Sequence, residues 1–135
     1  MSRVSACRFI RTAAPRAWAV VSDFTRMAEW NPLVLACRPE GASGQYRLTV
    51  ATGHEVLAQI EERDKAALRL KYKFFHGQLP LIDYRSTLAV EPEGVGCTIA
   101  WTSEFTPLGP EGMILPMLQT SYDQVLDRLK ALLER

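Results

Sequence analysis

The side chains best suited to chemistry in this sequence are hydroxyls spaced two residues apart in two apolar stretches. Tyr84 and Ser86 share one face of the stretch 80–91, and Ser103 has an equivalent position in the stretch 96–105. Hydroxyls that face an apolar interior need hydrogen-bond partners, which a side chain, an ordered water or a bound ligand can supply. The spacing therefore predicts either a polar patch inside a ligand site or side chains that satisfy one another locally.

Ionisable groups are poorly placed for general acid–base chemistry. Alternation puts Asp83 and Glu104 on the outer face of the same two stretches, where pairing with surface cations is their ordinary role. His54 and His76 both fall in predicted turns, although His54, at a strand tip, is also a candidate interior group. The sequence has no nucleophile elbow, phosphate loop, dinucleotide fingerprint or metal-ligand spacing. We therefore expect no metal and no cofactor.

Composition sets the class of protein in which these hydroxyls operate. The chain has 135 residues, 47% hydrophobic and 23% charged, with a net charge of +1. This is typical of one globular domain spanning 1–135 and argues against a nucleic-acid partner, which favours a strong basic excess. Three widely spaced cysteines and the lack of a signal-peptide core or a long apolar run predict a cytoplasmic protein without stable membrane insertion. Composition does not indicate an oligomeric state.

Periodicity predicts the elements that position the hydroxyls. Residues 3–11 form a strand, Pro15 opens a short helix, and a second short helix with Thr25 as its N-cap ends before Pro32. Alternation and turn residues then predict six strands, at 33–38, 44–51, 54–63, 66–75, 80–91 and 96–105. The last pattern is helical, from about 109 to 133, and Pro116 is expected to kink this helix or delay its start.

An antiparallel sheet with one apolar face needs a cover, and only the C-terminal helix is long enough to provide it. We therefore predict an α+β fold, in which a curved seven-stranded antiparallel sheet surrounds that helix and leaves room for a cavity. Side chains expected to face inward from the last two strands are Ile82, Tyr84, Ser86, Leu88, Val90, Ile99, Trp101, Ser103 and Phe105.

Five short motifs occur in chain order, namely Ala13–Trp18, Asp23-Phe24, Trp30-Asn31-Pro32, Asp83–Thr87 and Trp101–Pro107. Together they resemble the START/Bet v 1-like (SRPBCC) helix-grip superfamily, and within it the polyketide cyclase/dehydrase-like proteins. The resemblance implies a helix-grip fold of order β-α-α-β6-α over nearly the whole chain. It specifies function poorly, because lipid carriers, hormone receptors, allergens and aromatic cyclases share this fold.

The resemblance also implies where a ligand binds. Plant abscisic-acid receptors place the tyrosine and serine of a Tyr-x-Ser pattern in their cavity, which corresponds here to Tyr84 and Ser86. The gate and latch motifs of those receptors are not recognisable in this sequence. Tyr46 and His54 are further expected interior polar groups. The expected ligand-lining residues are Tyr72, Phe74, Tyr84, Ser86, Leu88, Trp101, Ser103, Phe105, Leu118, Tyr122 and Val125.

Two functions follow as hypotheses. The first is binding of a hydrophobic or aromatic small molecule, lipid- or polyketide-like, between the sheet and the C-terminal helix. The alternative is a polyketide cyclase/dehydratase-type enzyme, for which the resemblance suggests Tyr84, Tyr72 and His54 as groups that polarise carbonyls or move protons. A regulatory or interaction domain without a small ligand is a third. Alternation finds no ionisable residue deep in the interior, which favours binding.

Overall fold

A single antiparallel sheet organises the chain in the computed structural model, which describes residues 1–77 and 79–135. Its seven strands are β1 (Ser2–Ile10), β2 (Val34–Pro39), β3 (Gln45–Val50), β4 (Glu55–Asp64), β5 (Arg69–Gly77), β6 (Leu81–Glu93) and β7 (Gly96–Pro107). The spatial order is β1-β7-β6-β5-β4-β3-β2, so β2 to β7 form a meander and β1 adds to β7. The predicted α+β class, the seven antiparallel strands and their order along the chain are confirmed.

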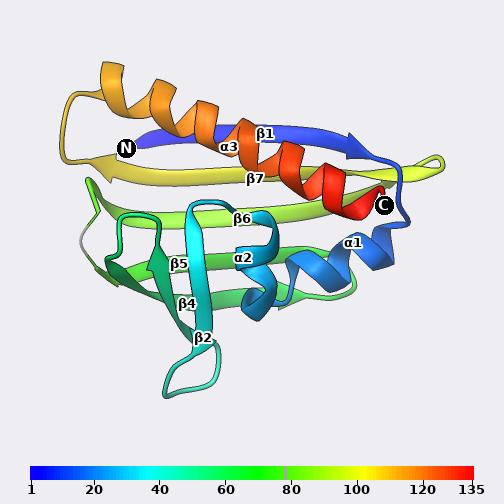
Figure 1. Cartoon of the computed structure of the whole chain (residues 1–135), viewed down its shortest axis with the longest axis horizontal. Helices are drawn as coiled ribbons and strands as arrows, with labels where there is room; N and C mark the ends of the chain where they lie inside the picture. Colours follow the sequence, from blue (N-terminus) through cyan, green and yellow to red (C-terminus); the bar gives the residue numbers. More distant parts are fainter. Residues whose placement is uncertain (78) are drawn as a thin grey trace.

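Helices cover one face of this sheet (Figure 1). After β1 come α1 (Ala14–Val21), the 3-10 helix η1 (Phe24–Arg26) and α2 (Met27–Trp30), and α3 (Glu111–Leu133) closes the chain. Pro15 lies in the first turn of α1, as predicted, where its missing N–H costs no hydrogen bond. Among the helices of the described residues, none is both long and apolar enough to cross a membrane.

The predicted N-cap of the second short helix was wrong. Thr25 lies inside η1, and the capping side chain is that of Asp23, whose carboxylate accepts a hydrogen bond from the Thr25 N–H at 3.1 Å; α2 follows directly, with Arg26 at its N-cap position. Of the two alternatives predicted for Pro116, the late helix start is excluded, since α3 begins at Glu111 and continues through the proline. The helix continues because the residues on both sides of Pro116 keep their helical hydrogen bonds, and only the one that the proline cannot donate is lost.

Strand β6 departs from the predicted alternation at its first residues. Leu81 and Tyr84 are buried, whereas Ile82, which we predicted to face inward, is 49% exposed. The register between β6 and β7 shifts between Ile82 and Arg85, and Asp83 adopts a left-handed φ of 55°. This irregularity changes the side-chain alternation by one residue and moves Ile82 out of the interior. From Tyr84 onward the predicted pattern holds, with Ser86, Leu88 and Val90 buried.

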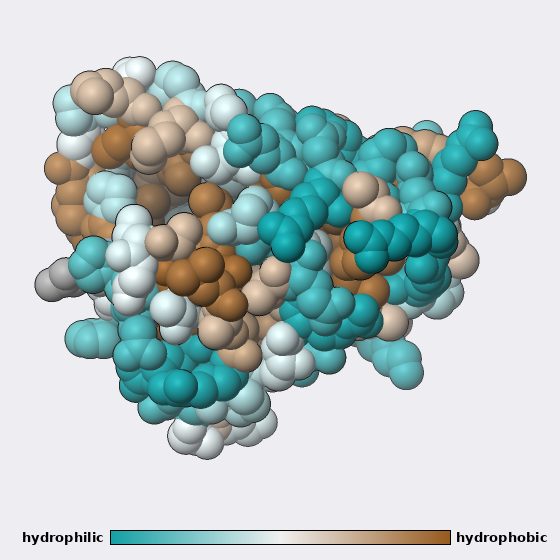
Figure 2. All heavy atoms as spheres, in the orientation of Figure 1, coloured by the Kyte–Doolittle hydropathy of each residue, from teal (hydrophilic) through white to brown (hydrophobic). Residues whose placement is uncertain are grey.

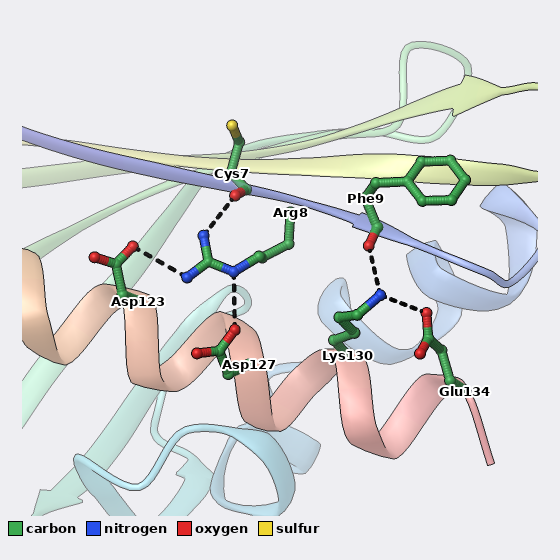
Figure 3. A network of polar contacts seen from close by, with 7 residues as sticks. All are labelled: Cys7, Arg8, Phe9, Asp123, Asp127, Lys130 and Glu134. Carbon is green, nitrogen blue, oxygen red and sulfur yellow. Dashed lines mark hydrogen bonds and ion pairs between the residues drawn. The ribbon is translucent and has the colours of Figure 1, made fainter.

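Polar contacts hold the C-terminal half of α3 against the free edge of β1 (Figure 3). The Arg8 guanidinium lies between two carboxylates of α3, 2.8 Å from Asp127 and 3.4 Å from Asp123. The Lys130 ammonium donates a hydrogen bond to the Phe9 carbonyl at 3.0 Å. These contacts fix the C-terminal half of the helix along β1.

Candidate functional site

A cavity of about 310 Å³ lies between the first half of α3, the segment around α2, and the inner face of β3, β5, β6 and β7. Its walls are mostly apolar, as at Met27, Leu48, Phe74, Ile114 and Leu118. Figure 2 shows a hollow bordered by hydrophobic residues beneath the first turns of α3. The sheet curves away from the helix there, so that apolar side chains face space instead of one another.

A cluster of hydroxyls forms one wall of the cavity. The Tyr84 and Tyr122 hydroxyl oxygens are 2.5 Å apart, and the Ser103 hydroxyl lies 3.0 Å from Tyr84 and 2.5 Å from Tyr122. Ser103 also lies 2.9 Å from the Ser86 hydroxyl, which accepts the Trp101 indole N–H at 2.5 Å. We call these five residues the hydroxyl cluster. Their hydrogen-bonding groups satisfy one another across three elements, β6, β7 and α3.

Ring packing fixes the orientation of the cluster tyrosines. Tyr122 stacks on Trp101 with ring centroids 3.7 Å apart and planes 2° from parallel. Tyr84 stacks on Phe74 at 4.4 Å. Aromatic neighbours at these separations lock the rings, so the hydroxyls stay directed at Ser103 instead of sampling other positions.

Tyr72 lies beside the hydroxyl cluster and is buried as deeply as its members. Burial raises the pKa of Tyr72 and Tyr84 well above the ordinary tyrosine value, and the mutual proximity of the tyrosines adds to the effect. Burial likewise raises the pKa of Tyr122. All three phenols are therefore neutral at physiological pH and act as hydrogen-bonding groups, not as bases.

Asn31 adds a polar group on the opposite side of the cavity. The side chain is only 4% exposed, and its carbonyl accepts the Leu33 N–H at 2.9 Å, which orients the amide. Asn31 ends α2 with an extended backbone, as the following Pro32 requires. Among the described residues, no acceptor lies within hydrogen-bonding distance of the amide nitrogen. The nitrogen is thus a donor available to a cavity occupant.

Six of the eleven residues expected to bind ligand line the cavity. These are Tyr72, Phe74, Tyr84, Trp101, Leu118 and Tyr122. Ser86 and Ser103 lie behind this wall as partners in the hydroxyl cluster. Leu88, Phe105 and Val125 are fully buried in the hydrophobic core, away from the cavity lining.

The two other expected interior groups have different environments. Tyr46 is half-buried and packs against Phe24 at a centroid distance of 5.1 Å. His54 is exposed in the turn between β3 and β4, where its Nδ1 lies 3.0 Å from the Thr52 hydroxyl. The prediction that His54 is an interior group was wrong, because it lies in an exposed turn after the end of β3. His54 is therefore not placed to act within the cavity.

Sequence reasoning missed the side of the cavity opposite the hydroxyl cluster. Asn31, Leu33 and Val34 come from the segment that follows α2, and Leu48 and Val50 come from β3. The Trp30-Asn31-Pro32 motif marked this region, but a motif does not say which side chain faces a space. Pairing of β2 with β3 brings the two segments together.

Comparisons with known proteins agree with this architecture. The sequence profile of the family described as "Polyketide cyclase / dehydrase and lipid transport" matches residues 1–134. The chain belongs to this family. The helix-grip resemblance drawn from the five motifs is thereby confirmed. No curated protein matches the sequence.

Solved structures of family-like proteins superpose over nearly the whole chain. A Thermobifida fusca protein is 28% identical, with a TM-score of 0.77 and coverage of 96% of this chain and 91% of that one. A START superfamily protein from Mycobacterium smegmatis is 17% identical, with a TM-score of 0.85 and coverage of 98% and 97%. The di-domain ARO/CYC BexL of the BE-7585A biosynthetic pathway is 15% identical, with a TM-score of 0.73 over 99% of this chain and 45% of that one. The last two show a shared fold.

Proposed function

We propose that this member of the polyketide cyclase/dehydrase and lipid transport family binds a hydrophobic or aromatic small molecule in the cavity beneath α3. The observation that carries the proposal is the combination of apolar walls, a volume of about 310 Å³ and one hydroxyl cluster. Small-molecule sites typically combine an apolar enclosure of this size with a few converging polar groups. The family's fold supports the same reading.

Filling the cavity tests this proposal. Leu118 lines the cavity from α3, so Leu118→Trp places a larger ring in the space. Met117, which is exposed at the mouth, gives a second variant, Met117→Trp, that does not disturb the core. The neutral dye Nile red is titrated by fluorescence against each folded protein. We expect both variants to weaken Nile red binding by about tenfold or more, because each occupies ligand space.

Ala131→Trp is the matched control, because Ala131 is exposed on α3 outside the cavity lining. This variant adds the same ring to the same helix and should bind Nile red as the wild type does. Equal dye binding by all four proteins would place the dye elsewhere and contradict the proposal. Native mass spectrometry of protein purified from its own host then identifies the natural occupant by mass.

A second function, cyclase/dehydratase-type catalysis, is favoured by one observation. Three phenols converge on one wall, where the Tyr72 hydroxyl, outside the hydroxyl cluster, can donate a hydrogen bond to a substrate carbonyl beside Tyr84 and Tyr122. Their raised pKa makes them weak acids, so positioning would supply most of the acceleration. Tyr72→Phe and Tyr84→Phe should each lower turnover of an aromatic polyketide while retaining Nile red binding. Turnover that survives both changes contradicts a catalytic role for these hydroxyls.

A further inference from the structure

The walls of the cavity bear on the charge of its occupant. No described residue that lines the cavity is aspartate, glutamate, lysine, arginine or histidine. Among the described lining residues, the titratable groups are three tyrosines, and burial keeps their hydroxyls neutral. We propose that the cavity selects uncharged ligands with a polar group that both donates and accepts hydrogen bonds, and that it excludes carboxylates and phosphates. This inference rests on the proposed ligand-binding function.

The cations nearest the cavity belong to another space. Lys73 and Arg85, together with Asp83, line a cleft of about 510 Å³ where β5 and β6 diverge. The residues that border both spaces, Phe74, Leu79, Leu81 and Tyr84, carry no charged group. A carboxylate inside the cavity would consequently lose its hydration without gaining a cationic partner, which strongly disfavours the charged form.

Counting protons in the hydroxyl cluster shows what kind of polar group fits. Four hydroxyls and the Trp101 N–H supply five protons, and the cluster has five internal contacts at hydrogen-bonding distance. The Ser86 hydroxyl also lies 3.3 Å from the Thr102 carbonyl, a sixth contact. With fewer protons than contacts, the cluster has no proton left for a ligand. The Tyr84 and Tyr122 oxygens retain capacity to accept one.

Donors for the ligand come from outside the hydroxyl cluster. Asn31 and Tyr72 both line the cavity, and among the described residues the Asn31 side chain has a hydrogen bond only at its oxygen, from the Leu33 N–H. A ligand hydroxyl or primary amide can give a proton to the cluster oxygens and accept one from Asn31 or Tyr72. A carboxylate can accept the hydrogen bond from Asn31 or Tyr72 but has no proton to donate to the cluster oxygens. It also brings a negative charge without a cationic partner.

Two isosteric ligands test the selection by charge. 2-Naphthamide and 2-naphthoate share a ring system and a planar polar group, but only the second is charged at pH 7.5. Each is titrated against the protein with Nile red bound, so that displacement reports binding in the cavity and not in the outer cleft. We expect 2-naphthamide to displace the dye at least about tenfold more effectively, with 2-naphthol resembling the amide.

A gain-of-function variant makes the test independent of folding defects. Ser121 is half-buried on the cavity wall, so Ser121→Lys brings a cation to the site. In this variant the ratio of Nile red displacement by 2-naphthamide to displacement by 2-naphthoate should fall by about tenfold. Thr120→Lys, at the exposed neighbouring position, should leave that ratio unchanged. Displacement by 2-naphthoate that equals or exceeds displacement by 2-naphthamide in the wild type overturns the inference but leaves the proposed function standing. Nile red binding that survives both Leu118→Trp and Met117→Trp instead rejects the proposed function, and the inference with it.

Discussion

The two halves of α3 belong to one continuous helix but pack very differently. Residues 122–133 contribute five buried side chains to the core, whereas in residues 111–121 only Ile114 is buried. Met113 and Met117, on the first half, are 72% and 53% exposed. Burial on this scale stabilises a helix segment far more than intrinsic propensity does. The second half therefore mainly stabilises the fold, with Tyr122 at its start also lining the cavity, while the first half packs loosely beside the cavity.

The two halves of α3 also differ in their polar contacts with the rest of the protein. The Arg8 ion pairs and the hydrogen bond from Lys130 to the Phe9 carbonyl fix the second half (Figure 3). Arg16 adds a third contact, because its guanidinium donates to the Leu133 carbonyl at 2.6 Å. On the first half, Ser2 donates to the Glu111 carboxylate at 2.9 Å and Gln119 donates to a β1 carbonyl. Segments that open for a ligand usually belong to the less stable parts of a structure, so we expect the first half of α3 to move when a ligand enters the cavity.

The largest expected effect comes from truncating the core in the second half. Leu129 is fully buried, so Leu129→Ala removes buried methyl groups and leaves a cavity. We expect the free energy of unfolding to fall by about 3 kcal/mol. Met117→Ala, in the first half, should change it by less than about 0.5 kcal/mol. Urea denaturation followed by circular dichroism measures both, and similar losses in the two variants would contradict the contrast between the halves.

Sequence patterns anticipated the second half of α3 better than the first. The helical spacing over 109–133 places Tyr122, Val125 and Leu129 on one face, and all three are buried in the structure. Periodicity gives the direction in which a side chain points, but not the distance to what it faces. It therefore could not distinguish Leu118, on the cavity, from Val125, in the core.

The same limit applies to the sheet. Alternation correctly placed Ser86, Trp101 and Ser103 inside, because β6 and β7 pair in regular register over these residues. It failed at Ile82, since the register shift there leaves no mark on the pattern of apolar residues. Asn31 escaped prediction because a polar residue between a helix and a proline looks like an ordinary loop residue. Its position on the cavity depends on contacts between distant segments.

Removing the proline in the first half of α3 should make the two halves more alike. Pro116 lies inside the helix and cannot donate a hydrogen bond to the Gly112 carbonyl. Pro116→Ala restores this donor, and we expect a local stabilisation of about 1–2 kcal/mol after the greater unfolded-state entropy of alanine is subtracted. Hydrogen exchange of amides 113–120 should slow by about tenfold, with amides 122–133 unchanged. Unchanged exchange in the first half would show that Pro116 does not limit its stability.

Breaking the Arg8 ion pairs should lower the free energy of unfolding by a smaller amount. Arg8→Gln removes contacts with Asp123 and Asp127, all three of which are partly exposed. Exposed pairs contribute little, so we expect a loss of about 0.5–1 kcal/mol in the free energy of unfolding. The loss should shrink in 1 M salt, where charges are screened within about 3 Å. Arg128→Gln, on the exposed face of α3, is the control, and an equal effect there would deny the ion pairs a specific role.

The smallest effect is expected at the end of α3, where Glu134 accepts hydrogen bonds from the Lys130 ammonium at 2.7 Å and the Arg11 N–H at 2.9 Å. These contacts, with Lys130 the larger, lower the pKa of Glu134 from its usual value of 4.5. A carboxyl whose pKa is lower in the folded state contributes stability that is present above the unfolded pKa and lost as the pH falls through the folded pKa.

Glu134→Gln should therefore make the stability of the protein to urea depend less steeply on pH. Between about pH 5 and pH 3 the wild type loses the contribution of Glu134, whereas the variant has none to lose. The urea midpoint, measured at intervals across this range, should fall less steeply in the variant. Glu91→Gln removes an exposed carboxyl from β6, outside α3, and should keep the wild-type slope. A common slope for all three proteins would mean that the Glu134 contacts add nothing to the stability of the second half, which is then held by core packing and by Arg8, Arg16 and the Lys130–Phe9 hydrogen bond.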